Sequence, residues 1–469
     1  MYNVRILYNG CEKTIQADKG AKLSEVLCHY GISAHHPCGG RGVCKKCAVT
    51  VNGKKELSCT YRINEDITVL IEEDNIESVT GTDETKTATD NMCLCFDIGT
   101  TTLALALVSL DEGNIIATVV ENNPQRAFAA DVMSRIDYVG KNGVLKMQQA
   151  VISAVNSMAE KLLKQYGIAR VEKLYVAGNM TMLHLFFGID CTGMGVSPYE
   201  PVFLDKKALP SEKIGINCSR KVISLCGISA FVGADIVAGL GYVGMPEKGK
   251  YNLLIDLGTN AEIVLYSENV LLCTAAAAGP CFEGVNISCG MSAVKGAVYS
   301  YNGKLCLTIG GGEAKGVCAT GLIDALAVML NGGIVDETGF LTDKEFEIAK
   351  DVRLTQEDIR QFQLAKSAIY SGIIALIKKQ KISFNDIDKV FVAGGFSAKM
   401  NLGNAIRVGL LPKEVQGRFY PVNNSSLLGC VKHACENNSF DAFLKNARYV
   451  DLAKDEYFQN LFIENMMFE

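Results

Sequence analysis

The sequence lacks the features that mark membrane, exported and nucleic-acid-binding proteins. Its longest apolar runs, such as residues 103–110, fall well short of the roughly 18 residues that a membrane helix needs. The N-terminal MYNVRILYNG has no charged region followed by an apolar one, so we expect no signal peptide. No cluster of five or more Lys and Arg occurs, and the net charge is −5, which argues against a nucleic-acid partner. These absences predict a soluble cytoplasmic protein that contacts neither membrane nor nucleic acid.

Cysteine, by contrast, is plentiful. Eighteen of the 469 residues are Cys, which is below the density of a disulfide scaffold, and a cytoplasmic chain lies in a reducing compartment. We therefore expect most of the thiols to be free, and those in apolar stretches to be buried like small hydrophobic side chains. Such a surplus of thiols suits anaerobic metabolism.

The alternation of apolar and polar residues predicts a small α+β unit, a β-grasp fold, over residues 1–75. Residues 22–30 carry apolar side chains at helical spacing, and a Gly- and Cys-rich loop follows them. Four strands are expected, at residues 2–8, 12–17, 48–51 and 67–71. Residues 76–91 are predicted to be a flexible acidic linker, because residues 72–90 hold seven acidic side chains, one Lys and few apolar groups.

From residue 92 to residue 469 strands alternate with helices, as in an α/β domain, and one pattern occurs twice. LCFDIGTTTLALAL at 94–107 and LLIDLGTNAEIVL at 253–265 both contain an apolar strand, Asp-x-Gly-Thr and a second apolar strand. Asp97 and Asp256 are 159 positions apart, too far for the repeat of a solenoid. The echo predicts two homologous lobes, the second starting near residue 251.

Four cysteines between residues 38 and 59 have the spacing C-x5-C-x2-C-x11-C. Plant-type [2Fe–2S] ferredoxins hold their cluster with four thiolates in a closely related C-x4-C-x2-C arrangement. The thiolates can converge only if the loop curls tightly, and Gly39, Gly40 and Gly42 allow this because glycine tolerates positive φ. We predict a [2Fe–2S] cluster on Cys38, Cys44, Cys47 and Cys59. The alternative is a zinc site begun by the C-x2-C pair, but zinc usually takes two such pairs, and here the last cysteine stands alone.

Each Asp-x-Gly-Thr hairpin has the chemistry of a phosphate clamp. The glycine permits a tight turn, Thr hydroxyls and peptide N–H groups face a phosphate, and the Asp carboxylate holds a water on Mg²⁺. Two opposed hairpins would clamp the phosphate chain of ATP together with the metal. The residues concerned are Asp97, Gly99, Thr100, Thr101 and Thr102 in the first lobe and Asp256, Gly258, Thr259 and Asn260 in the second.

A third element completes this predicted nucleotide site. KVFVAGGFS at 389–397 is an apolar strand that ends in Gly394 and Gly395, where the backbone can approach adenine and ribose closely. Glu283 in GPCFEG is a candidate for the lobe interface or for positioning the hydrolytic water, with a buried, hydrogen-bonded carboxylate as the alternative. The periodicity also predicts helices at 364–379 and at 317–330, the latter crossing between the lobes.

The combination of these parts resembles a known family, the reductive activators of corrinoid proteins, which join an N-terminal [2Fe–2S] ferredoxin to an actin-like ATPase. The resemblance covers nearly the whole chain, although larger members carry another domain where this chain has only the acidic linker. It includes three long stretches, NPQRAFAADVMSRI (123–136), VAGNMTMLHLFFGI (176–189) and GPCFEGVNISCGMSAVKGAV (279–298). The implied fold is a β-grasp ferredoxin domain followed by a duplicated two-lobe domain of the actin/Hsp70/sugar-kinase (ribonuclease H-like) type.

The resemblance implies an ATP-dependent electron-transfer enzyme, an ATPase and oxidoreductase. The motifs described above make Asp97, Asp256 and Glu283 its candidate catalytic residues. It would take one electron from a low-potential donor and reduce Co(II) to Co(I) on the corrinoid protein of a methyltransferase system; homodimer formation is left open. Two alternatives remain. A small-molecule kinase with a redox-regulatory module would need a general base, for which Asp131 or Asp235 is available. A nucleotide-gated electron carrier or redox sensor would need none.

Overall fold

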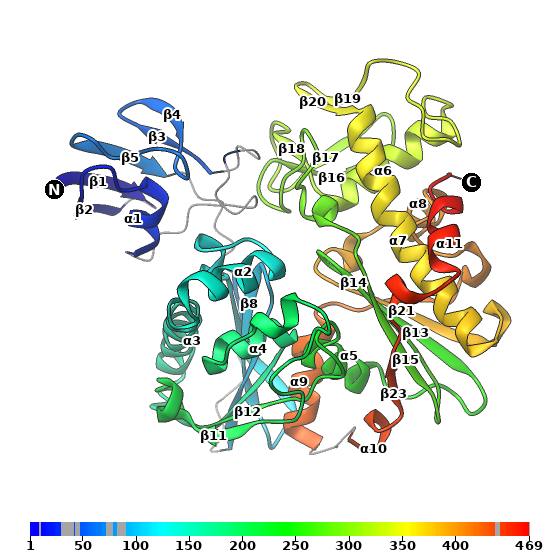
Figure 1. Ribbon diagram of the computed structural model, residues 1–469, viewed down its shortest axis with the longest axis horizontal. Coiled ribbons are helices and arrows are strands. Elements are labelled where there is room, and N and C mark those ends of the chain that lie inside the picture. The colour runs from blue at the N-terminus through cyan, green and yellow to red at the C-terminus, as the bar shows by residue number, and fades with distance from the viewer. Residues whose placement is uncertain are drawn as a thin grey trace. The chain divides into compact units, whose positions relative to one another are not determined.

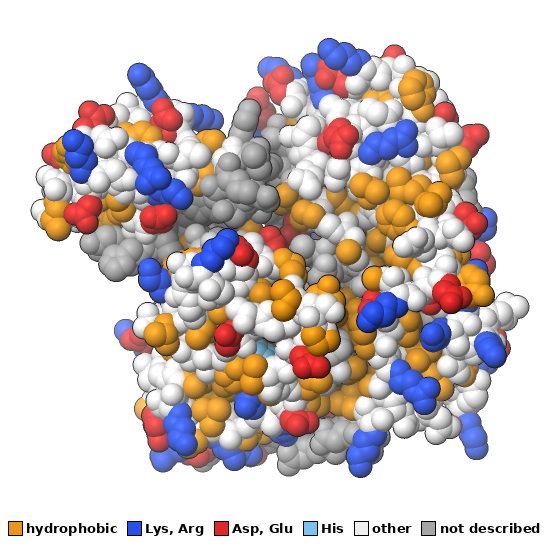
Figure 2. Space-filling view, viewed as in Figure 1, with side chains coloured by type: hydrophobic (Ala, Val, Ile, Leu, Met, Phe, Trp, Pro, Cys, Tyr) orange, Lys and Arg blue, Asp and Glu red, His pale blue; other side chains and the backbone are white. Residues whose placement is uncertain are grey.

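The structure, a computed structural model, describes residues 1–8, 11–29, 42, 47–71, 78–81, 91–436 and 441–468. It divides into two units, Met1–Cys226 and Gly227–Glu469, whose helices and strands are drawn in Figure 1. Over these ranges no helix has the length and apolar character needed to cross a membrane. On the face drawn in Figure 2, Lys and Arg side chains are interspersed with Asp and Glu.

The first unit begins with a five-stranded sheet in the order β2-β1-β5-β3-β4. The predicted strands and helix are present in it, and their apolar side chains form a small core around Ile6, Leu27 and Val69. β4 was not predicted, because its KKEL sequence is largely exposed at the sheet edge. That this sheet belongs to a ferredoxin stays a prediction. The elements are β1 (Tyr2–Tyr8), β2 (Cys11–Ala17), α1 (Leu23–His29), β3 (Ala48–Val51), β4 (Lys54–Leu57) and β5 (Ile67–Ile71).

The linker prediction is wrong in part, because Ser78–Gly81 forms strand β6. This strand pairs antiparallel with β9 (Asn114–Asn122) at the edge of the second sheet. The short SVTG segment lies between acidic residues, so its composition resembles a linker, but its β-branched Val and Thr favour a strand. Strand β9 at the sheet edge offers this segment a partner. The predicted linker of residues 76–91 therefore contains a strand, while residues 76, 77 and 82–90 lie outside the described residues.

The large sheets of the two units share one five-strand order. In each, the first three strands are parallel neighbours and the last three are antiparallel neighbours. In the first unit the order is β12 (Ser219–Ser224), β10 (Val171–Gly178), β7 (Met92–Ile98), β8 (Thr102–Ser109) and β9. In the second it is β22 (Phe419–Pro421), β21 (Ile387–Ala393), β13 (Tyr251–Leu257), β14 (Ala261–Tyr266) and β15 (Leu271–Ala276). The fold is therefore duplicated, and the second set of strands begins at Tyr251.

Helices cover these sheets with their apolar faces. α3 (Leu145–Gln165) packs against β8 and β9 of the first unit. α7 (Gln356–Gln380), which contains the predicted helix at 364–379, packs against β14 and β15 of the second unit (Figure 1). α7 starts sharply because Thr355 and Asp358 form a capping box, in which each side chain accepts the backbone N–H of the other.

The helix expected to cross between the lobes lies within the second unit instead. α6 (Ala319–Asn331) packs against β16 (Ala297–Tyr301) and α8 (Leu402–Arg407). Its buried Asp324 accepts hydrogen bonds from the Tyr301 N–H at 3.1 Å and from Asn404 Nδ2 at 2.7 Å. An almost continuous apolar sequence indicates that a helix is buried, but it does not say where in the fold the helix lies.

Candidate functional site

Two of the four predicted cluster cysteines lie in the described residues, and they are neighbours. Cys47 precedes β3 and Cys59 follows β4, and the Ser58 N–H donates to the Cys47 carbonyl oxygen at 3.0 Å. This connection places the two Sγ atoms 3.2 Å apart, with each residue only 2% exposed. The pairing of β3 with β4 is therefore what brings the second half of the cysteine loop together.

The position of these thiols fits a shared metal atom. A tetrahedral metal with bonds of about 2.3 Å would hold two thiolates ~3.8 Å apart, so the two sulfurs, 3.2 Å apart, would have to separate slightly to share one. Beside Cys59, Gly42 adopts a φ of +76°, and a Cβ there would lie 2.9 Å from Thr60 Cγ2. Glycine is needed at this point of the loop for both reasons. Within the described ranges no three potential ligands converge. Outside those ranges lie Cys38, Gly39, Gly40 and Cys44.

The first Asp-x-Gly-Thr sequence forms the tight hairpin between β7 and β8. Asp97 lies opposite Ala104 in the ladder, and the Gly99 N–H donates to the Thr102 carbonyl oxygen at 3.0 Å. A Cβ on Gly99 would lie 2.6 Å from that same backbone oxygen, so a larger residue would force the turn open. The predicted residues 99–102 thus form one compact turn at the carboxyl end of β7.

Polar side chains from outside the hairpin hold this turn. Asn123 Nδ2 donates to the Gly99 carbonyl oxygen at 2.8 Å, and Arg135 Nη2 donates to the Thr100 carbonyl oxygen at 2.6 Å. Asn179 Nδ2 donates to Thr100 Oγ1 at 3.3 Å. All three donors belong to the family-like stretches to which sequence reasoning assigned no role. No spacing rule links them to the hairpin, because the fold alone brings them there.

The second Asp-x-Gly-Thr sequence forms a hairpin that is one residue shorter. Leu257 pairs with Ala261, and the Gly258 N–H donates to the Asn260 carbonyl oxygen at 2.9 Å. A carboxylate replaces the amides and the guanidinium of the first hairpin, since Thr259 Oγ1 donates to Glu283 Oε1 at 2.7 Å. The structure thus brings Glu283 to the predicted residues 258–260, in contact with a hydroxyl that was expected to face a phosphate.

Further carboxylates surround the second hairpin. Glu262 lies opposite Asp256 in the ladder between β13 and β14, and Asp235 lies in the first turn of α5 (Ala234–Val243). Burial, followed by the negative charges of Asp235 and Asp256, raises the pKa of Glu262 well above its ordinary value. Sequence reasoning proposed Asp235 only as a kinase base and missed Glu262, whose place becomes evident only from the strand register.

The two predicted glycines after β21 differ in their surroundings. Gly394 has a φ of +105°, and a Cβ there would lie 2.1 Å from the Leu257 carbonyl oxygen, so packing against the second hairpin already requires glycine. A Cβ on Gly395 would meet nothing within 4 Å, which leaves space beside the backbone. Gly178 at the end of β10 is the counterpart of Gly394, with Ile98 in the place of Leu257. The Val-Ala-Gly sequence at both 176–178 and 392–394 is a second internal repeat that the sequence analysis missed.

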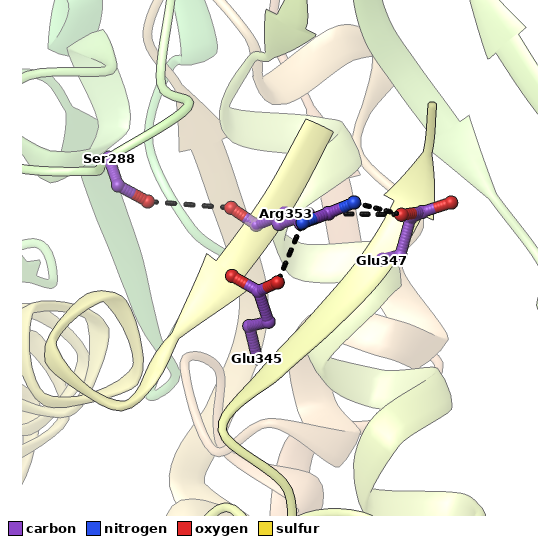
Figure 3. A network of polar contacts seen from close by, with 4 residues as sticks. All are labelled: Ser288, Glu345, Glu347 and Arg353. Atoms are coloured by element: carbon purple, nitrogen blue, oxygen red, sulfur yellow. Dashed lines mark hydrogen bonds and ion pairs between the residues drawn. The ribbon is translucent and has the colours of Figure 1, made fainter. Parts of the chain in front are cut away.

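The third family-like stretch, residues 279–298, is anchored by the polar network of Figure 3. The Ser288 N–H and Oγ each donate to an oxygen of Asp358 at 2.6 Å, and Oγ also lies 3.4 Å from the Arg353 carbonyl oxygen. Arg353, on β20 (Val352–Thr355), pairs with Glu345 at 2.7 Å and with Glu347 at 2.9 Å, both on β19 (Glu345–Ala349). The stretch is therefore fixed to the start of α7 at one point and to the second hairpin at another.

Two family models match the chain. The model described as the RACo middle region matches residues 92–248, and the model described as the C-terminal domain of RACo, the ASKHA domain, matches residues 250–469. Together they cover about four fifths of the chain. Each contains one of the two hairpins.

Individual proteins are similar over most or all of the chain. The chain is 25% identical to the corrinoid activation enzyme RamQ of Eubacterium limosum over 99% of both chains, in an alignment of 589 positions, so that relative has segments with no counterpart here. It is 24% identical to the [Co(II) methylated amine-specific corrinoid protein] reductase of Methanosarcina barkeri, over 79% of this chain and 76% of the relative. A solved structure of a reductive activator for a corrinoid, iron-sulfur protein is 26% identical with a TM-score of 0.70, covering 100% of this chain and 98% of that one.

Proposed function

We propose, from the premise that the chain belongs to the reductive activators of corrinoid proteins, that it returns an inactive Co(II) corrinoid on a partner protein to Co(I). The reaction would transfer one electron and would be driven by ATP. The observation that carries the proposal is the presence, in one chain, of two Asp-x-Gly-Thr hairpins on duplicated sheets and of a buried thiol pair from a four-cysteine loop. The names of the relatives support the choice of partner.

The electron would come from a [2Fe–2S] cluster held by Cys38, Cys44, Cys47 and Cys59. When bound, such a cluster supplies one electron at low potential. The five-stranded sheet contributes the fixed separation of Cys47 and Cys59 and their removal from solvent. Burial and backbone N–H groups around the sulfurs are the means by which a protein tunes such a potential.

ATP would bind through its phosphates to the two hairpins and through its nucleoside near Gly395. Asp97 and Asp256 would each hold a water of Mg²⁺, as carboxylates at phosphate sites commonly do. Glu283 would act through Thr259, whose hydroxyl it fixes at 2.7 Å, so we propose it as a positioning residue for the second hairpin. The open space at Gly395 supports close approach of the nucleoside.

The need for ATP follows from the electron's energy. A plant-type [2Fe–2S] ferredoxin has a potential near about −400 mV, and Co(I) lies at lower potential still. For one electron, about 59 mV corresponds to a tenfold change in the equilibrium constant, so a gap of roughly 200 mV corresponds to about 5 kcal/mol. Shifting a two-state protein from 1:99 to 99:1 requires about 5.5 kcal/mol. The free energy of a nucleotide-driven conformational change is thus large enough to offset the gap in potential.

The test uses the full chain, prepared without oxygen, together with a low-potential reductant and a Co(II) corrinoid protein. We expect two irons and two sulfides per chain, and loss of the Co(II) electron paramagnetic resonance signal only when ATP and Mg²⁺ are present. Cys59→Ala should abolish the reduction while ATP still binds. A zinc-only protein would contradict the cluster, and reduction without ATP would contradict the coupling. ATP-dependent phosphorylation of a small alcohol would indicate the kinase alternative, and nucleotide binding without either reaction would indicate a sensor.

A further inference from the structure

We infer that Arg135, assisted by Asn123 and Asn179, is a positioning residue for the nucleotide phosphates, because it orients the peptide groups of the first hairpin and places a positive charge behind them. The inference rests on the proposed ATP site and adds to it the residues that prepare its first half. None of the three was predicted to be functional from the sequence. Their common feature is that their donors converge on residues 99–101.

Arg135 is fully buried on α2 (Val132–Asn142), at 0% exposure, which is unusual for a guanidinium. Nε donates to the Ala129 carbonyl oxygen at 3.1 Å, and Nη1 donates to Gln125 Oε1 at 3.1 Å and lies 2.8 Å from Met182 Sδ. These contacts fix the plane of the guanidinium, so that Nη2 points at the Thr100 carbonyl oxygen. Since arginine stays protonated in proteins, a permanent positive charge lies directly behind the hairpin.

The donors act on three consecutive carbonyl groups of the hairpin. Gly99 accepts from Asn123 Nδ2 at 2.8 Å, Thr100 from Arg135 Nη2 at 2.6 Å, and Thr101 from the Asn123 N–H at 2.9 Å. In a trans peptide the C=O and the following N–H point in opposite directions. Holding each of these three oxygens on its donor therefore fixes the direction of the N–H group that follows it, which points away from that donor. Backbone N–H groups fixed in this way are the kind of donor that binds anions in a concave turn.

The positioning residues are themselves held in place. Asn179 Oδ1 accepts the Met182 N–H at 2.9 Å at the start of α4 (Met180–Phe187), while its Nδ2 reaches Thr100 Oγ1. Asn123 Oδ1 accepts the Gln125 N–H at 3.0 Å. The hairpin is thus supported by side chains with fixed orientations before any ligand arrives, so little ordering is left to oppose phosphate binding.

The test compares the affinities of the full chain for ATP, ADP and adenosine, with the thermal unfolding midpoint as a second readout. Arg135→Gln should weaken ATP and ADP binding about 10- to 100-fold, the range for a lost hydrogen bond to a charged group. Adenosine should bind as before, because it has no phosphate. Arg135→Lys keeps the charge but loses the planar fork, so its phosphate affinity should lie between those of Arg135→Gln and the wild type.

Arg170, an exposed arginine of the same unit, provides a control. It precedes β10, and its Nη2 donates to the carbonyl oxygen of Ser219 at the start of β12. Both residues lie at the amino ends of parallel strands, whereas the hairpin lies at the carboxyl end of β7. Arg170→Gln therefore removes an arginine hydrogen bond that lies in the same unit but away from the hairpin, and the variant should bind ATP, ADP and adenosine as the wild type does.

Several results would overturn the inference. If Arg135→Gln binds ATP as tightly as the wild type, or loses adenosine and ATP equally, Arg135 serves only the packing of the unit. If that variant does not fold, Asn179→Ala tests the inference in its place, since it removes only the Thr100 contact and a helix cap. It should weaken ATP more than adenosine by a few-fold, and an equal effect on both would overturn the inference. A wild-type chain that binds no adenine nucleotide would instead overturn the proposed function, and the inference with it.

Discussion

The two Asp-x-Gly-Thr hairpins share a sequence and a topology, but their surroundings are opposite in charge. Amide and guanidinium donors hold the first, from Asn123 and Arg135. Carboxylates hold or face the second, from Glu283 and Glu262. The two units thus share the Asp-x-Gly-Thr sequence and the strand order, while the length of the turn and the residues that support it differ. In the proposed nucleotide site, the donors around the first hairpin would suit a phosphate, and a bound Mg²⁺ would offset the negative charge at the second.

We expect the largest effect, on ATP hydrolysis, from substituting the two hairpin aspartates, and this experiment could refute the proposed difference between the hairpins. Asp97→Ala and Asp256→Ala should each lower Mg²⁺-dependent ATP hydrolysis by roughly 100-fold, the size of a lost electrostatic contact in an active site. If the second hairpin is the metal side, Asp256→Ala should also raise the Mg²⁺ concentration needed for half-maximal rate more than Asp97→Ala does. Cluster absorption should be unchanged in both. Unchanged hydrolysis in the two variants would reject the site.

The two turn glycines give a matched pair with the next largest effect. A Cβ on Gly99 would lie 2.6 Å from a backbone oxygen, whereas a Cβ on Gly258 would lie 3.4 Å from the nearest one. Gly99→Ala must shift the turn and should cost about 1–3 kcal/mol of stability, as overpacking does, and it should weaken ADP binding. Gly258→Ala should change both by little. Thermal unfolding and ADP titration of the two variants test this, and equal effects would show that the turns do not differ as described.

The sequence predicted the hairpins themselves but not the residues that support them. Motifs that are local in sequence, such as Asp97-x-Gly99 and its echo at Asp256, predicted both hairpins and the start of the second lobe at residue 251. Supporting residues could not be predicted in this way, because Arg135 lies 35 positions from the carbonyl group that it contacts. For the same reason, the SVTG strand β6 was mistaken for linker, since its stability depends on the distant β9.

Removing the threonine hydroxyls should have a smaller effect, on stability, and should show how the hydrogen bonds of the two hairpins differ in strength. Thr259 donates to a carboxylate at 2.7 Å, while Thr100 accepts from the neutral Asn179 amide at 3.3 Å. Thr259→Val should therefore cost about 1 kcal/mol of stability, and Thr100→Val about half as much. Thr259→Ser retains the hydroxyl and should behave like the wild type. Thermal unfolding measures all three, and a larger loss for Thr100→Val than for Thr259→Val would contradict the assignment of the stronger bond to the second hairpin.

The smallest effect concerns the register position that distinguishes the hairpins most directly. Ala104 lies opposite Asp97 in the first, and Glu262 lies opposite Asp256 in the second. Burial, and then the charges of Asp235 and Asp256, raises the pKa of Glu262 above its ordinary value. A carboxyl group with a higher pKa in the folded chain stabilises that chain at low pH, and this contribution is lost as the pH rises through the folded pKa.

Glu262→Gln removes the titration while keeping the shape of the protonated side chain. Without Mg²⁺, the unfolding midpoints of variant and wild type should be similar near about pH 5. They should then diverge as the pH rises toward about pH 9, with the variant the more stable, because only the wild type must hold a charged Glu262 beside Asp256. Added Mg²⁺ should narrow the difference, since a nearby cation favours the ionised carboxylate. Parallel midpoints across the whole pH range would mean that the charges around the second hairpin do not act on Glu262, and the electrostatic contrast between the two hairpins would then rest on Arg135 at the first and Glu283 at the second.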